Sequence, residues 1–339
     1  MTNSVTQPTY EDILSAQSRL KSIVKQTPIA ESSLLNRWMG QRILFKVECV
    51  QHTGSFKYRG ASNFLAKLAE QHQLPQKVVA NSSGNHAQAV ARAGHTYGLD
   101  TTIFAGQGIS PIKAAATRAY GATLRTFPTR PEADAAVKAA ASEPNTVWIP
   151  PFNHPDIIAG QGTVVAEAIE QVGHADAVFA PCGGGGLLSG SLLATRALLP
   201  NAVVIGSEPQ VANDASLSLQ SGEIQSLSGP VQTLADGAAT PAVGEFTFPL
   251  LQELDDFYEV NEQQIAYWTQ WLHHLLKIHV EPTSAMSMAA VTSWAINNEP
   301  GQTAIVVLSG GNISQQSMAQ VWETDYLQQP PIIHGEEAQ

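Results

Sequence analysis

The sequence is poor in cysteine, with only Cys49 and Cys182 among its 339 residues. Two thiols this far apart are too few for a disulfide framework or a zinc knuckle. They are also too few for an iron–sulfur cluster, which is held by about four thiolate ligands. The sequence therefore argues against a disulfide-stapled secreted scaffold and an iron–sulfur enzyme, and it favours a reducing compartment.

Long apolar runs and basic clusters are missing as well. No stretch approaches the ~18 apolar residues of a membrane span, and residues 1–10 lack the basic and apolar regions of a signal peptide. Lys and Arg number 18 against 29 Asp and Glu, the net charge is -11, and the basic residues are dispersed. Tracking along a nucleic-acid backbone needs a basic patch. We therefore expect a cytoplasmic protein that binds small molecules, with no nucleic-acid or membrane partner.

What is present is an alternation of short apolar strands with helical stretches, after an opening helix predicted near residues 10–24. The predicted strands that carry this alternation cover residues 77–80, 101–105, 123–127, 146–149, 177–180, 203–206 and 303–308. Such alternation is typical of α/β proteins with parallel sheets covered by helices. With 43% hydrophobic residues, the chain can bury a core large enough for two domains.

Three polar or glycine-rich segments directly follow predicted strands, at residues 81–86, 181–186 and 309–312. In open parallel sheets, ligands bind beyond the carboxyl ends of the strands, so we expect these segments to converge in space. The four consecutive glycines at 183–186 lead into an apolar helix. Their backbone N–H groups, aimed outward at a helix N-terminus, would form a phosphate cradle without a basic side chain.

Lys57 lies in a frame of Gly, Ser and aromatic residues and near a predicted helix N-terminus. A lysine against an aromatic wall is partly desolvated, which favours its neutral amine and lets it form an imine with an aldehyde. The segment 55–61 (Ser-Phe-Lys-Tyr-Arg-Gly-Ala) is therefore the candidate centre of the chemistry.

This lysine segment resembles the motif of the serine/threonine dehydratase and serine racemase family, which are fold type II pyridoxal-phosphate (PLP) enzymes. Three further motifs match in the same order, at residues 82–88, 183–187 and 309–312, and the resemblance covers about residues 27–320. It implies a tryptophan synthase β-like fold with the active site between two parallel-sheet α/β domains. The expected parts are a large PLP-binding domain (1–76 and 148–327), a small inserted domain (77–147) and a poorly ordered tail (328–339).

The resemblance also assigns the cofactor contacts. Lys57 would hold pyridoxal 5'-phosphate and then act as general base, and Asn85 would contact the ring oxygen. Phe56 would pack on the ring, although an ordinary core role stays equally open. Ser309 would face the pyridine nitrogen, where a hydroxyl leaves the ring neutral and favours rapid loss of a β-substituent over transamination. The phosphate contacts would come from Gly183, Gly184, Gly185, Gly186 and Leu187.

The loop before Asn85 would bind the substrate carboxylate, through Ser82, Ser83, Gly84 and His86. Ser83 is ambiguous, because the matching serine of the racemases exchanges a proton on the face opposite the lysine. The resemblance further implies a divalent cation at Glu208, the carbonyl of Ala212 and Asp214, hard oxygen ligands that suit Mg²⁺ and, alternatively, Mn²⁺ or Ca²⁺.

The expected function is a PLP-dependent dehydratase, or ammonia-lyase, that converts serine, threonine or 3-hydroxyaspartate to a 2-oxo acid and ammonia. The alternatives are an amino-acid racemase and a non-catalytic PLP-binding protein. A 3-hydroxyaspartate enzyme needs a cation or helix terminus for the second carboxylate, and the sequence leaves Arg59, Arg118 and Arg130 undecided. The resemblance also implies a homodimer, and we expect no isoleucine feedback of the kind that a regulatory domain gives to some biosynthetic threonine dehydratases.

Overall fold

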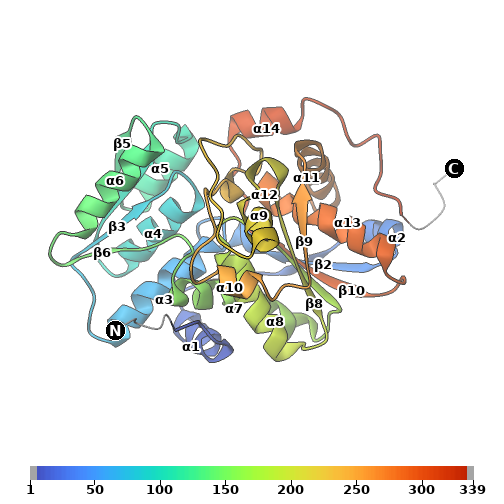
Figure 1. The fold of residues 1–339 in the computed structure, drawn as a ribbon, viewed down its shortest axis with the longest axis horizontal. Coiled ribbons are helices and arrows are strands. Elements are labelled where there is room, and N and C mark those ends of the chain that lie inside the picture. Colours follow the sequence, from blue (N-terminus) through green and yellow to red (C-terminus); the bar gives the residue numbers. More distant parts are fainter. Residues whose placement is uncertain (1–5, 334–339) are drawn as a thin grey trace.

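Two sheets, each in its own lobe, make up the fold of residues 6–333, which the computed structural model describes (Figure 1). The six-stranded sheet contains, in spatial order, β1 (Ile29–Glu31), β2 (Arg42–Val47), β10 (Thr303–Leu308), β7 (Ala177–Pro181), β8 (Val203–Pro209) and β9 (Asp256–Val260). The four-stranded sheet contains β5 (Thr123–Phe127), β4 (Asp100–Gly106), β3 (Lys77–Asn81) and β6 (Thr146–Trp148). All neighbouring strands are parallel except β1 and β2. The α/β fold with parallel sheets is therefore confirmed.

Helices cover these sheets. The elements of the small lobe are α4 (Asn85–Thr96), α5 (Pro111–Ala119) and α6 (Arg130–Ala141). The helices before and after it are α1 (Tyr10–Leu20), α2 (Ser33–Met39), α3 (Lys57–Glu70), α7 (Pro155–Val172), α8 (Gly186–Leu198), α9 (Asp214–Ser221), α10 (Phe248–Leu251), α11 (Glu262–Leu276), α12 (Pro282–Ala285), α13 (Ser287–Asn297) and α14 (Gln315–Val321). Short 3-10 turns are η1 (Glu48–Val50), η2 (Gln210–Ala212) and η3 (Asp236–Ala238).

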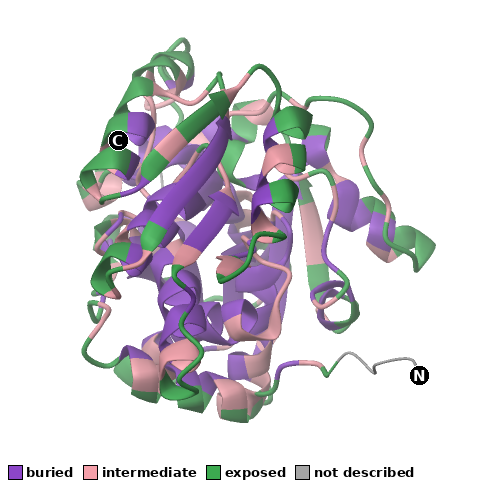
Figure 2. Cartoon of the chain, turned by 90° about the vertical axis from the view of Figure 1, so that its left-hand side faces the viewer, coloured by how far each residue is buried: buried purple, intermediate pink, exposed green. Residues whose placement is uncertain are grey.

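The central strands β10 and β7 are mostly apolar because helices bury both of their faces. On one face of the large sheet, Ile13 of α1, Val164 of α7 and Leu188 of α8 join one core cluster. On the other face, Leu35 of α2 and Val291 of α13 join a second cluster. Figure 2 shows the buried strands between helices whose outer surfaces are exposed.

Helix α3 begins at Lys57, as predicted from the small residues around it, and packs against both α7 and α4. Its approach to α7 is very close, since a Cβ at Gly160 would come 2.8 Å from the carbonyl oxygen of Arg59. Glycine at this position therefore allows the two helix backbones to touch. The lysine helix is thus held between the two lobes.

Arg59, one of the candidate cations for a second substrate carboxylate, is buried and paired within the protein. Its guanidinium is 1% exposed and pairs with Glu48 at 2.8 Å and Glu167 at 2.9 Å. These charges raise the pKa of Arg59 above its ordinary value, although burial alone would lower it. Arg59 therefore ties together η1, α3 and α7 and is not available to substrate.

The four-stranded sheet is built from one continuous segment, and both flanks build the six-stranded sheet, while the exact domain limits stay a prediction. The predicted tail begins with residues that pack against the large lobe, since Ile333 donates its backbone N–H to the carbonyl of Trp38 at 2.8 Å. Its last six residues, 334–339, lie outside the described range. Within residues 6–333, no helix is both long enough and apolar enough to cross a bilayer.

Candidate active site

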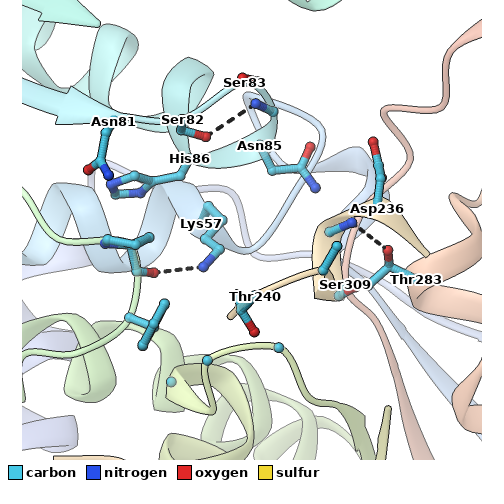
Figure 3. A pocket seen from close by; sticks show the side chains of 18 of the residues that line it. Lys57, Asn81, Ser82, Ser83, Asn85, His86, Asp236, Thr240, Thr283 and Ser309 are labelled. Atoms are coloured by element: carbon cyan, nitrogen blue, oxygen red, sulfur yellow. Dashed lines mark hydrogen bonds between the residues drawn. The ribbon is translucent and has the colours of Figure 1, made fainter. Parts of the chain in front are cut away.

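A cavity of about 290 Å³ lies between the two sheets, where the loops after β3, β7 and β10 meet (Figure 3). It brings together Phe56, Lys57, the 82–86 loop, the 183–187 loop and Ser309. The predicted metal residues Glu208, Ala212 and Asp214 do not line it. The convergence expected from the parallel-strand pattern is therefore observed, while the roles of the individual residues stay predictions.

Lys57 points its amine into this cavity. Its Nζ donates a hydrogen bond to the carbonyl of Pro151 at 2.6 Å and lies 5.1 Å from the centre of the Phe56 ring. Burial lowers the pKa of Lys57 to about 8, against the opposing charge of Glu281. An amine with that pKa is about 10% neutral at pH 7, whereas an ordinary lysine is about 0.03% neutral. The site therefore supplies a nucleophilic amine near neutral pH.

Backbone pairing fixes the lysine beside Ser309. Ser55 bridges to Gly310, and the N–H of Phe56 donates to the carbonyl of Ser309 at 3.0 Å. The Ser309 side chain is 1% exposed, and its hydroxyl lies 3.0 Å from the hydroxyl of Ser284 in α12. The group predicted to face the pyridine nitrogen is thus a buried, hydrogen-bonded hydroxyl that lines the same cavity as Lys57.

The four-glycine loop, residues 183–186, forms another wall of the cavity. Gly185 caps α8 in the left-handed region, with φ +90°, and no described side chain bonds to this helix start. A Cβ at Gly184 would overlap the ring of Phe152, so this position has room for glycine alone. Thr240 packs next to Gly183, and its buried hydroxyl has no hydrogen-bond partner among residues 6–333. Free N–H groups and a free hydroxyl at one helix N-terminus fit a phosphate.

The loop before α4 provides a second helix N-terminus at the cavity. Gly84 caps α4 and donates its N–H to the hydroxyl of Ser82 at 3.2 Å, and no other described side chain bonds to this cap. Ser83 is exposed at the cavity wall. Unpaired N–H groups here suit a carboxylate, since the helix dipole favours negative charge.

His86 lies close to Lys57 in Figure 3, but one nitrogen of its ring already forms a hydrogen bond within the protein. Its Nε2 lies 2.9 Å from the carbonyl of Ile149, which requires the proton on that nitrogen. Burial, together with the charge of Lys57, lowers the pKa of His86 to about 3. The ring is therefore neutral, and its Nδ1 is a hydrogen-bond acceptor without a positive charge.

Sequence reasoning missed the carboxylate that orients Asn85. The Asn85 amide donates to both oxygens of Glu281, at 2.8 and 3.1 Å, and accepts from the amide of Asn312 at 2.8 Å. Burial raises the pKa of Glu281 to about 7. The Ser-Gly-Gly-Asn motif marked Asn312 as part of the site, but Glu281 lies in no motif and only the tertiary fold brings it there.

The predicted metal ligands lie at the end of β8. Glu208 accepts hydrogen bonds from the N–H groups of Ala215 and Ser216, at 3.2 and 2.7 Å. Both carboxylate oxygens of Asp214 are buried without a partner in the described part of the chain. Burial raises the pKa of Glu208 to about 9 and that of Asp214 to about 7. Two buried carboxylates, of which Asp214 has no hydrogen-bond partner in the described chain, and the buried Ala212 fit a hard cation. No group of three or more His, Cys, Asp or Glu within residues 6–333 could hold a metal, so backbone carbonyl and water ligands would complete this set.

The cradle predicts a steric effect on cofactor affinity. Gly184→Ala should weaken uptake of PLP by about 10-fold or more, because the added methyl group must displace Phe152 from the loop. Gly108→Ala is the matched control, since a Cβ there meets nothing within 4 Å. Equilibrium titration of the cofactor-free proteins with PLP measures the effect. Equal affinities for both variants, with unchanged circular dichroism, would contradict the cradle.

Comparisons with known proteins agree with this geometry. The chain matches the family model "Pyridoxal-phosphate dependent enzyme" over residues 20–310. It is 40% identical over 316 residues to L-threo-3-hydroxyaspartate ammonia-lyase of Saccharomyces cerevisiae, covering 92% of this chain and 95% of that protein. It is 36% identical over 321 residues to serine racemase of Schizosaccharomyces pombe, covering 94% and 98%.

A solved structure has a similar fold. The threonine deaminase of T.th. superposes with a TM-score of 0.85 at 39% identity, covering 91% of this chain and 99% of that one. The resemblance inferred from the four motifs is therefore confirmed. This chain belongs to the pyridoxal-phosphate dependent enzymes of fold type II, in the family of serine/threonine dehydratases and serine racemases.

Proposed function

We propose that the protein is a PLP-dependent ammonia-lyase that converts a β-hydroxy amino acid to a 2-oxo acid and ammonia. The observation that carries this proposal is the Lys57 amine, with its pKa of about 8, in a cavity that also holds a phosphate cradle and the hydroxyl of Ser309. The names of the relatives, ammonia-lyase, racemase and threonine deaminase, all describe amino-acid substrates. Serine, threonine and 3-hydroxyaspartate are the candidate substrates.

The cofactor, held by Lys57, Asn85 and the 183–187 loop, would supply an electron sink for negative charge at the substrate Cα. The N-terminus of α4 and the 82–84 loop would bind the substrate carboxylate and so fix the direction of the Cα–H bond. The Lys57 amine, once exchanged for the substrate amine, would take the Cα proton, because its lowered pKa leaves it partly neutral.

Racemisation is the second candidate, and the position of Ser83 favours it. Ser83 lines the same cavity as Lys57, but on the α4 side, so its hydroxyl is available as a second proton-exchanging group beside the Lys57 amine. Several relatives at 34% to 36% identity are named serine racemase. The same cavity could therefore run both reactions, at rates that depend on Ser83.

A substrate panel decides between these functions. We predict that the protein releases ammonia and a 2-oxo acid from at least one of L-serine, L-threonine and the 3-hydroxyaspartate stereoisomers. Lys57→Ala should abolish release, and Ser83→Ala should reduce racemisation more than ammonia release, because elimination needs a base on one face only. Chiral chromatography and keto-acid assay measure both. D-serine formed faster than pyruvate would select the racemase, and a PLP-loaded protein inert to all substrates would select a non-catalytic binding protein.

We also infer that Glu208, Ala212 and Asp214 hold Mg²⁺, or alternatively Mn²⁺ or Ca²⁺, which would stabilise the end of β8. The support is the pair of buried carboxylates, one without any hydrogen-bond partner in the described chain. Removing the cation would leave these charges uncompensated in a buried position. The homodimer and the cytoplasmic location inferred from the sequence remain predictions.

Chelation tests the cation. Exhaustive treatment with EDTA should lower the melting temperature, and Mg²⁺, Mn²⁺ or Ca²⁺ should restore it. Glu208→Gln should remove this response, because it deletes a charged ligand, whereas Glu223→Gln on the surface should retain it. Thermal unfolding and elemental analysis measure both. A purified protein that contains no metal and melts at the same temperature before and after chelation would contradict the proposal.

A further inference from the structure

Three cationic side chains of residues 6–333 line the cavity, and two of them are already engaged. Lys57 is the proposed cofactor anchor. Lys113 is 8% exposed and pairs with Asp236 at 2.6 Å, so its charge is neutralised. Arg130 donates one hydrogen bond, at 3.3 Å, to the carbonyl of Ala239. Most of the guanidinium donors of Arg130 are therefore free to bind a ligand.

Among the acidic side chains that line the cavity, Asp134 alone forms an ion pair with Arg130 in the described part of the chain, and that contact is long. The Oδ2 of Asp134 lies 4.0 Å from the Nε of Arg130, at the limit of an ion pair, and the Oδ1 of Asp134 accepts from the amide of Asn81 at 2.5 Å. Asp236 is paired with Lys113. Glu281 accepts from Asn85 and from the backbone of Asn312. Arg130 is 60% exposed, and its long contact with Asp134 leaves most of its guanidinium donors open to a ligand.

The position of Arg130 relates this charge to the substrate loop. Arg130 is the first residue of α6, and Asp134 follows one turn later on the same helix. Asp134 binds Asn81, the last residue of β3, and Ser82 and Ser83 come directly after it. The first turn of α6 and the loop expected to bind the α-carboxylate therefore belong to one wall of the cavity. The N-terminus of α6 adds its own favourable dipole for an anion.

The two other arginines considered as carboxylate ligands are excluded by their places in the fold. Arg59 is buried with Glu48 and Glu167. Arg118 is exposed on α5 and does not line the cavity. Of the three, only Arg130 faces a ligand space.

We propose that Arg130 binds the distal carboxylate of a dicarboxylic β-hydroxy amino acid, of the size of 3-hydroxyaspartate. The proposal rests on the ammonia-lyase function and names its substrate class. A guanidinium matches a carboxylate with two parallel hydrogen bonds, whereas serine and threonine offer no group that could use them. The α-carboxylate lies at the N-terminus of α4 and the second carboxylate at the N-terminus of α6, so the two ends of the substrate are held by separate helices.

Kinetics of the holoenzyme test this specificity. Arg130→Gln should lower the ratio of kcat/KM for 3-hydroxyaspartate to that for L-serine by about 10- to 100-fold, the range for losing a charged hydrogen-bond pair. Arg130→Lys should recover part of the ratio. Arg118→Gln removes the same charge from α5 outside the cavity and should leave the ratio unchanged. An equal ratio in wild type and Arg130→Gln would overturn the proposal.

Binding of succinate and butyrate, which differ by one carboxylate and lack an amine, separates the subsite from catalysis. Wild-type holoenzyme should bind succinate more tightly than butyrate by calorimetry, and Arg130→Gln should remove the difference. If no hydroxy amino acid releases ammonia but this preference persists and depends on Arg130, the subsite stands and the ammonia-lyase function falls. If serine is eliminated normally while wild type shows no preference for succinate, the ammonia-lyase stands and the subsite falls.

Discussion

The desolvated amine of Lys57 is the constraint on which the rest of the site depends. Burial disfavours the charged form of a lysine. Here burial lowers the pKa of Lys57 to about 8, even though the charge of Glu281 acts to raise it. The carbonyl of Pro151 and the ring of Phe56 hold the amine in one place. A neutral amine at a fixed position is what both imine formation and proton removal require.

The fold places the other groups around this amine through the geometry of parallel sheets. The strands β3, β7 and β10 all end at the cavity, so the 82–86 loop, the 183–187 loop and Ser309 meet in one space. The bridge between Ser55 and Gly310 then sets the lysine loop in register with the end of β10. Helix α3, packed against both α4 and α7, connects the amine to both lobes.

The sequence predicted those parts of the site whose signals are local. Some signals can be recognised without tertiary information: apolar runs of strand length, glycines before a helix, and polar residues after a strand. These signals identified the 82–86 and 183–187 loops, which line the cavity. Glu281 and Thr240 were missed because nothing in their own segments marks them, and only folding brings them to Asn85 and Gly183. Arg59 was a candidate ligand for a second substrate carboxylate, but it is paired within the protein. The sequence could not show this pairing, because its partner Glu167 lies 108 residues away.

The acidity of Lys57 is the most direct test of this account. Cofactor-free protein would be mixed with PLP from about pH 6 to about pH 11, trapped with borohydride, and digested to quantify the labelled peptide. The account predicts labelling at Lys57 with an initial rate that rises with pH to half its maximum near pH 8, because the neutral amine is the reactive form. Labelling at other lysines, or a midpoint above about pH 10 as for a solvated lysine, would contradict it.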